Sequence, residues 1–163
     1  MRASKAILWG ALSLALYAAG CKTEPAQANP EPAASAAATK KLELKPAGAG
    51  DVATLMVAEA AKAKANGRKV LVYVGAPWCE PCQAFHKAAA KGELDSTFPD
   101  VTFVEFNADN DGERLAKAGY SSTYIPLFVV PGADGRASSK RVEGGIKGDG
   151  VVPYLTQKIR TIL

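Results

Sequence analysis

VLVYVGAPWCEPCQAF, residues 70–85, is the stretch of sequence that decides the fold. Its first half belongs to an unbroken apolar run rich in β-branched residues, which predicts a buried strand over 69–75. Its second half predicts a helix over 81–91. Cys79 and Cys82 therefore lie where a buried strand runs into the start of a helix.

The start of a helix favours the thiolate form of Cys79. Free N–H groups and the positive end of the helix dipole face this position, and such a site can lower the pKa of a cysteine from about 8.5 to about 3.5–7.5. The thiolate is the attacking species in thiol–disulfide exchange. Glu80 and Pro81 place Cys82 one helical turn away, so that it can attack a mixed disulfide and release the substrate.

Other uses of a Cys-x-x-Cys pair agree less well with this sequence. Zinc needs about four ligands, and the further candidates are His86 and Cys21, of which Cys21 lies outside the predicted domain. Covalent haem attachment needs a His directly after the second Cys, where this chain has Gln83. A purely structural disulfide would close a very small loop with little entropic benefit. We therefore favour redox exchange and expect no metal.

The sequence on either side of this stretch predicts alternating helices and strands. The expected elements are a helix over 52–65 with Asp51 as N-cap, a strand over 101–107, a short helix over 111–118, a strand over 125–130, a turn at 132–135, its hairpin partner over 136–142, a terminal helix over 150–163, and an edge strand at 42–44. Strands joined by helices imply parallel pairing, and the final hairpin implies an antiparallel edge. We expect an α/β fold with a central mixed sheet flanked by helices.

The N-terminus has the pattern of a signal peptide. Residues 1–5 are basic, and residues 6–19 (AILWGALSLALYAA) are apolar and shorter than the ~20 residues that a membrane-spanning helix needs. The following AAGC resembles a bacterial lipobox, although Ala18 stands where Leu is most frequent. We expect residues 1–20 to be a lipoprotein signal peptide and Cys21 to be lipidated; conventional cleavage that leaves Cys21 a free thiol is the open alternative.

A tether separates this segment from the domain. Residues 21–45 are rich in Ala and Pro and have too little apolar mass to fold, so we expect a flexible linker, followed by a single domain at 46–163. Covalent acyl chains on Cys21 would hold the protein on a membrane surface, at the periplasmic face of a bacterial cell envelope.

The charge balance argues against nucleic acid as a partner. The chain has 20 basic and 16 acidic residues, a formal net charge of +4. Arg2 and Lys5 lie in the segment expected to be removed, and the remaining 18 basic residues nearly balance the 16 acidic ones. No stripe of Lys and Arg with interleaved aromatics is present.

Residues 70–85 resemble the active-site region of the thioredoxin superfamily. Tyr124-Ile125-Pro126 before an apolar strand resembles the cis-proline loop of that family, FNAD at 106–109 the end of its central strand, and VEGG at 142–145 the approach to its last helix. The resemblance covers about residues 51–163 and implies a thioredoxin fold.

The resemblance also implies roles for the catalytic residues. Cys79 would be the nucleophile and Cys82 the resolving thiol, and a redox-active disulfide between them would take the place of any cofactor. Pro126, in the cis form, would hold the backbone of Ile125 next to Cys79, where substrate strands can pair. The open alternative for Pro126 is a simple strand start.

Substrate contacts are implied for the residues around the cysteines. Trp78 would shape the surface beside the sulfurs, with Glu80, Pro81 and Ile125. Glu80 stands where thioredoxin itself has Gly, and its negative charge would raise the pKa of the Cys79 thiol slightly.

A second departure concerns proton transfer. Thioredoxins have a buried Asp six positions before the first Cys, and this chain has Tyr73 there. Adjacent strands would place Glu105 beside Tyr73, and we hypothesise that Glu105 replaces the Asp as proton acceptor. The alternative is a Glu105 that points to solvent, since charged residues are seldom fully buried.

Two further features suit structural roles. His86 is the only histidine and lies on the same helical face as Cys82; we interpret it as a partly exposed helix residue rather than a metal ligand or proton relay. Asp109, Asn110 and Asp111 resemble a calcium loop only superficially, because the Gly and terminal Glu spacing is missing. They are typical of a capped turn between a strand and a helix.

The expected function is protein thiol–disulfide exchange with proteins that carry disulfides or dithiols. Potentials of such folds run from about −270 to about −120 mV. Ile125 before Pro126, the Trp-Cys-x-Pro-Cys frame and a short domain without an inserted helical cap resemble reducing members, so we favour a monomeric reductase served by a membrane electron donor. Two alternatives stay open: a binding or chaperone module with an incidental disulfide, and a dedicated reductant for one client such as apocytochrome c or a copper-site protein.

Overall fold

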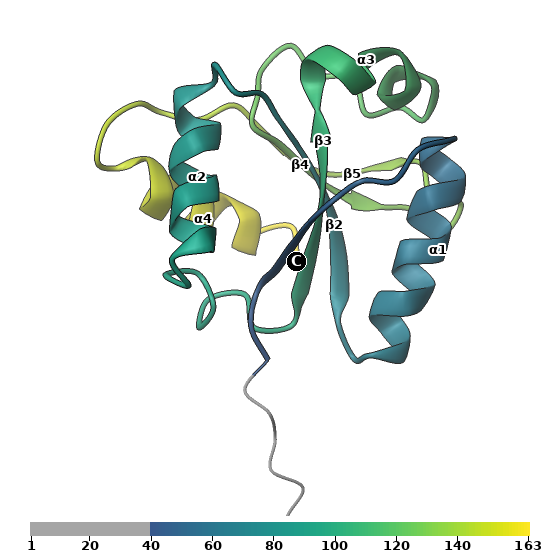
Figure 1. Ribbon diagram of the computed structural model, residues 1–163, viewed down its shortest axis with the longest axis horizontal. Coiled ribbons are helices and arrows are strands. Elements are labelled where there is room, and N and C mark those ends of the chain that lie inside the picture. Colours follow the sequence, from purple (N-terminus) through teal and green to yellow (C-terminus); the bar gives the residue numbers. More distant parts are fainter. Residues whose placement is uncertain (1–39) are drawn as a thin grey trace, which may run out of the picture. The chain divides into compact units, whose positions relative to one another are not determined.

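The computed structural model describes residues 40–163 (Figure 1). The elements in chain order are β1 (Glu43–Pro46), α1 (Val52–Ala65), β2 (Lys69–Gly75), α2 (Glu80–Ala90), β3 (Val101–Asn107), α3 (Ala108–Lys117), β4 (Leu127–Pro131), β5 (Ala137–Glu143) and α4 (Val151–Arg160). The predicted signal peptide, the lipidation of Cys21 and most of the predicted tether lie outside the described residues. Within residues 40–163, no helix is long and apolar enough to cross a membrane.

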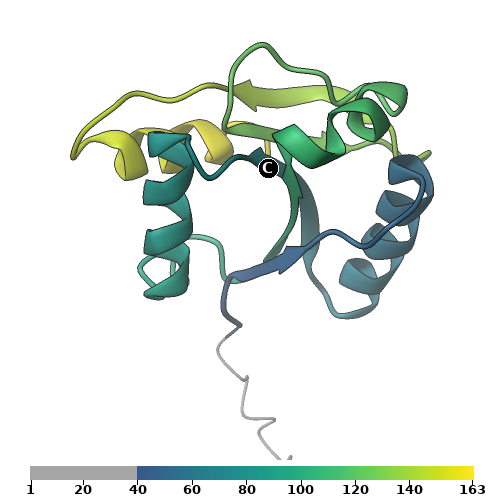
Figure 2. The same cartoon turned by 45° about the horizontal axis from the view of Figure 1, so that its top comes forward.

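The five strands form one mixed sheet in the order β1-β3-β2-β4-β5. β1, β3 and β2 are parallel, whereas β4 runs antiparallel to β2 and β5 antiparallel to β4. Helices α2 and α4 cover one face of the sheet, and α1 and α3 cover the other (Figures 1 and 2). The α/β architecture, with its parallel pairing and final antiparallel hairpin, confirms the sequence prediction.

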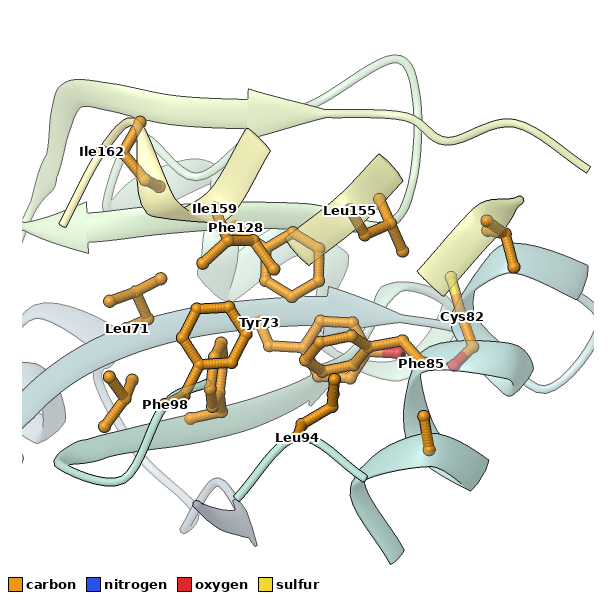
Figure 3. Packing of buried hydrophobic residues seen from close by; sticks show 14 of the residues in the cluster. Leu71, Tyr73, Cys82, Phe85, Leu94, Phe98, Phe128, Leu155, Ile159 and Ile162 are labelled. Atoms are coloured by element: carbon orange, nitrogen blue, oxygen red, sulfur yellow. Dashed lines mark hydrogen bonds between the residues drawn. The ribbon is translucent and has the colours of Figure 1, made fainter. Parts of the chain in front are cut away.

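The core beneath α2 is aromatic. Phe85 of α2 packs on Phe128 of β4 and on Tyr73 of β2, with ring centroids 4.9 and 5.3 Å apart, inside the range that aromatic pairs prefer (Figure 3). All three side chains are buried in the cluster that also holds Cys79 and Cys82. Phe85 therefore fixes the helix that carries the cysteines against the sheet.

Helix α1 begins where the sequence predicts. The carboxylate of Asp51 accepts hydrogen bonds from the N–H and the hydroxyl of Thr54, each at 2.8 Å. These two hydrogen bonds hold the pKa of Asp51 below its usual value, and the bond from the backbone N–H has the larger effect. The stability that this cap contributes is present above the pKa of the unfolded chain, and it is lost as the pH falls through the lower folded value.

The edge strand predicted at 42–44 is present as β1, displaced by one residue at its start. Its residues pair with Thr102 through Glu105 of β3, so the predicted boundary between tether (21–45) and domain (46–163) falls inside a strand. The side chains of Leu42 and Leu44 pack against the core. The folded domain therefore starts before residue 46, the position predicted from composition.

The bounds of α2, α3, β4, β5 and α4 differ from prediction by one to three residues, and the starts of α3 and β4 have identifiable causes. Helix α3 begins at Ala108 rather than 111, because the Asn107 side chain accepts the N–H groups of Asp109 and Asn110 and caps the helix directly after β3. Strand β4 begins at Leu127 rather than 125, because Pro126 has no N–H to donate to a ladder.

Candidate active site

Cys79 is the N-cap of α2, and its Sγ accepts the backbone N–H of Cys82 at 3.3 Å. The two sulfurs form a disulfide. Both cysteines are buried, with 4% and 2% of their surface exposed. An N–H donor aimed at the Cys79 sulfur stabilises a negative charge there, as expected for a helix start.

Trp78 stands out from the surface beside the disulfide, with 68% of its side chain exposed. Its indole Nε1–H donates to the carboxylate of Asp109, 3.0 Å from Oδ2. Asp109 is in the first turn of α3, so the loop before α2 is tied to the next helix along the chain. Sequence reasoning assigned Asp109 only to a turn and missed this contact.

The central dipeptide of the motif is packed against the loop between β5 and α4. Glu80 Oε1 accepts the N–H of Gly148 at 3.2 Å. Gly145 lies so close to Pro81 that an added Cβ would be 2.9 Å from the Pro81 Cβ. The sequence predicts Glu80 as a charge near the thiolate; in the structure this carboxylate also has a backbone donor.

The loop before β4 carries a cis Ile125–Pro126 peptide bond, which is the geometry that the resemblance implies. Pro126 is buried, and its carbonyl accepts the N–H of Gly144 at 2.9 Å. Ile125 packs against the cluster that contains both cysteines. Tyr124, the preceding residue, is 67% exposed.

Tyr73 lies under α2. Its hydroxyl donates to the carbonyl of Cys82 at 3.3 Å. Burial raises the pKa of Tyr73 above its ordinary value, and the negative charge of Glu105 raises it further by a smaller amount. Tyr73 therefore keeps its hydroxyl proton at neutral pH, so it acts as a hydrogen-bond donor and not as a proton acceptor. Glu105 is its register partner on β3, the neighbour position that the sequence predicts.

A groove of about 650 Å³ runs beside α2 at the carboxyl ends of β2 and β3. Tyr73, Cys82, His86 and Glu105 are among the residues that line it. Glu105 is 28% exposed, and its Oε2 is 3.0 Å from Nε2 of His86. Glu105 therefore points into the groove rather than away from the protein. His86 is half-exposed, as predicted, and the sequence did not reveal its pairing with Glu105.

The described part of the chain has no group of three or more His, Cys, Asp and Glu residues placed to hold a metal ion. The chemically reactive groups seen at the site are the two cysteines. A disulfide at a helix start, an exposed indole beside it and a neighbouring cis-proline loop form an arrangement that can bind a peptide strand and exchange disulfides with it.

Comparison with known proteins gives one family match. Residues 56–133, from α1 to the turn after β4, match a family model described as thioredoxin-like. No curated protein matches the chain.

Several solved structures are similar at low identity. Oxidised thioredoxin from Plasmodium falciparum is 19% identical, with 73% of this chain and 97% of that chain covered and a TM-score of 0.47. Thioredoxin from Trichomonas vaginalis is 20% identical, with 74% and 94% covered and a TM-score of 0.45. Thioredoxin from Fasciola hepatica is 24% identical, with 76% and 99% covered and a TM-score of 0.44.

Proposed function

The chain belongs to the thioredoxin superfamily, and from this premise we propose that it is a protein-disulfide reductase of the bacterial cell envelope. The fold and its Cys-x-x-Cys pair support thiol–disulfide oxidoreductase activity in general. The observation that carries the proposal is the position of Cys79 as N-cap of α2, where its sulfur accepts the N–H of Cys82.

The proposed reaction begins with the dithiol form. The Cys79 thiolate attacks one sulfur of a substrate disulfide; a Cys79–substrate bond forms, the substrate S–S bond breaks, and the leaving thiolate takes up a proton. Cys82 then loses its proton and attacks Cys79 Sγ, which forms the Cys79–Cys82 disulfide and releases the second substrate thiolate. Two electrons have passed to the substrate, and an electron donor in the membrane restores the dithiol.

We assign the substrate contacts to the surface around the disulfide. Trp78 and Ile125 would flank a substrate strand, with Glu80 and Pro81 at the start of α2. Pro126 would keep the backbone of Ile125 in place for pairing with that strand. The exposure of Trp78 and the packing of Ile125 on the cluster of the cysteines support this assignment.

Glu105 is our candidate for the proton acceptor of Cys82. Glu105 and Cys82 line the same groove, and Tyr73, the register partner of Glu105, is held as a donor to the Cys82 carbonyl. We expect Glu105→Gln to slow resolution of the mixed disulfide by about tenfold or more, because a positioned base contributes at least that much to proton transfer. Stopped-flow measurement of the release of a labelled substrate thiol from the mixed disulfide provides the rate.

Glu93→Gln is the matched control for this variant, since Glu93 is an exposed residue that pairs with Lys91. An unchanged rate of resolution in Glu105→Gln would remove Glu105 from the mechanism. An equal loss in both variants would show that the effect is not specific to the groove.

The direction of electron flow is tested by the potential of the Cys79–Cys82 pair, titrated in the purified protein against glutathione and dithiothreitol. We expect a value near about −270 mV, as for a reductase, because the Trp-Cys-x-Pro-Cys frame and Ile125 before Pro126 are similar to those of reducing members. A value near about −120 mV would make the protein a disulfide donor. Absence of reversible exchange would favour the alternative of a binding or chaperone module.

The location in the envelope is proposed from the sequence alone. The apolar segment at 6–19, the small residues before Cys21 and the Ala- and Pro-rich residues after it support a monomer tethered by lipid to the periplasmic face of a membrane. A dedicated client, such as apocytochrome c or a copper-site protein, is compatible with this position.

A further inference from the structure

A network of polar side chains from β5 holds the loop before Pro126. The Ser122 hydroxyl lies 2.6 Å from the carbonyl oxygen of Tyr124 and 2.9 Å from Oε2 of Glu143, and it accepts the N–H of Tyr124 at 3.2 Å. Arg141 donates from Nη2 to the carbonyl of Ser121 at 2.6 Å and pairs with Oε1 of Glu143. The loop is therefore connected to β5 through two successive loop residues, Ser121 and Ser122.

The strand that supplies these contacts is in fixed register with β4. Arg141 is opposite Val129, and Glu143 is opposite Leu127. Two residues apart on one strand, their side chains are on the same face of the sheet. Directly beyond Glu143, the N–H of Gly144 donates to the carbonyl of Pro126. The contacts to the loop thus continue the β4–β5 ladder past its end.

The position of Arg141 in this network is energetically unfavourable for one of its N–H groups. Its Nε is buried and has no hydrogen-bond partner among the described residues. A buried N–H without an acceptor is unfavourable, whereas an exposed arginine avoids that cost by remaining in water. The guanidinium nevertheless lies against the loop and meets both Ser121 and Glu143 through Nη2.

The network determines which backbone groups of the loop are free. The Ser122 hydroxyl accepts the N–H of Tyr124, and its single proton is shared between two acceptors, the Tyr124 carbonyl and Oε2 of Glu143. The N–H and C=O of Ile125 make no hydrogen bond within residues 40–163. A strand that pairs with this loop therefore finds its donor and acceptor at Ile125 and not at Tyr124.

We propose that Ser122, Arg141 and Glu143 form a clamp that positions the backbone of Ile125 for pairing with a substrate strand. The inference rests on the proposed function. The three are positioning residues, since their hydrogen bonds and ion pair are with the loop and with one another and not with the cysteines. The clamp acts on the binding of extended protein substrates, and it leaves the chemistry of the disulfide unchanged.

The test compares Glu143→Ala, Glu143→Gln and Ser122→Ala in the full-length protein, with Glu93→Ala as the matched control. Steady-state kinetics are measured for reduction of insulin, a protein substrate, and of a small aromatic disulfide that needs no strand pairing. We expect KM for insulin to rise about tenfold in Glu143→Ala and Ser122→Ala, with kcat unchanged, because a charge-assisted contact to the loop is lost. Glu143→Gln keeps an acceptor for Ser122, so we expect its KM for insulin to lie between those of the parent protein and Glu143→Ala.

The kinetics with the small disulfide and the potential of the cysteine pair are expected to be the same in all variants. An unchanged KM for insulin in Glu143→Ala and Ser122→Ala would overturn the clamp. An equal loss of activity on both substrates would also overturn it, since that result indicates general damage to the fold. A parent protein that reduces neither substrate contradicts the proposed function itself, which separates the two failures.

Discussion

Replacement of Cys79 by Ser is expected to lower the rate of disulfide exchange by about 10³-fold or more. In the proposed mechanism the Cys79 thiolate is the nucleophile, whereas a serine hydroxyl at the same helix start remains protonated and cannot form a disulfide. Reduction of insulin disulfides with dithiothreitol as electron source measures the loss. Because the chain has three cysteines, Cys21→Ser is the matched control, and we expect it to keep full activity.

Cys82→Ser is expected to give a different result from Cys79→Ser. The first attack remains possible, but no thiol is left to resolve the mixed disulfide. A covalent complex with the substrate should therefore accumulate and be visible by non-reducing electrophoresis. Two results would reverse the roles of the two residues. One is turnover that survives in Cys79→Ser. The other is a covalent complex that accumulates in Cys79→Ser and not in Cys82→Ser.

Gly135→Ala is expected to lower the free energy of unfolding by about 2–5 kcal/mol. Gly135 has φ = +76°, in the left-handed region, and a Cβ built on it would lie 1.9 Å from the carbonyl oxygen of Ala53 in α1. The left-handed conformation contributes about 1–2 kcal/mol, and the collision contributes about 1–3 kcal/mol. The Gly135 carbonyl also accepts the hydroxyl of buried Tyr120, so the turn cannot move away freely. Urea unfolding measures the change.

Gly112→Ala is the control for this effect. Gly112 lies within α3, and nothing is within 4 Å of the position that its Cβ would take. Alanine there should stabilise the protein by about 0.5–1 kcal/mol through helix propensity. A Gly135→Ala variant as stable as the parent would mean that α1 and the turn before β5 are not in this contact.

The strands at 69–75 and 101–107 are found at their predicted bounds, because central parallel strands are buried on both faces and read as unbroken apolar runs. The start of α3, in contrast, lies three residues before the predicted one. An Asn at the end of a strand acts as a cap only if the chain turns there into a helix, and hydrophobic pattern does not report that turn.

The position of the cysteine pair at a helix start was predictable because it depends on local order: a strand, two cysteines and a helix. The Tyr73–Glu105 register also followed from two parallel strands of known bounds. The remaining contacts were not predictable. Trp78–Asp109, Glu80–Gly148 and Ser122–Glu143 join residues 31, 68 and 21 positions apart. Such pairings depend on how loops are placed in three dimensions, which composition and periodicity do not record.

The contact between the motif and the loop before α4 has a consequence for protein engineering. Glu80 is bonded to the N–H of Gly148, and Gly145 fits against Pro81. A dipeptide transplanted from another oxidoreductase would remove the acceptor of Gly148 while the loop stayed the same. Residues 80–81 and 144–150 therefore form one structural unit, and a graft of the dipeptide should carry both segments.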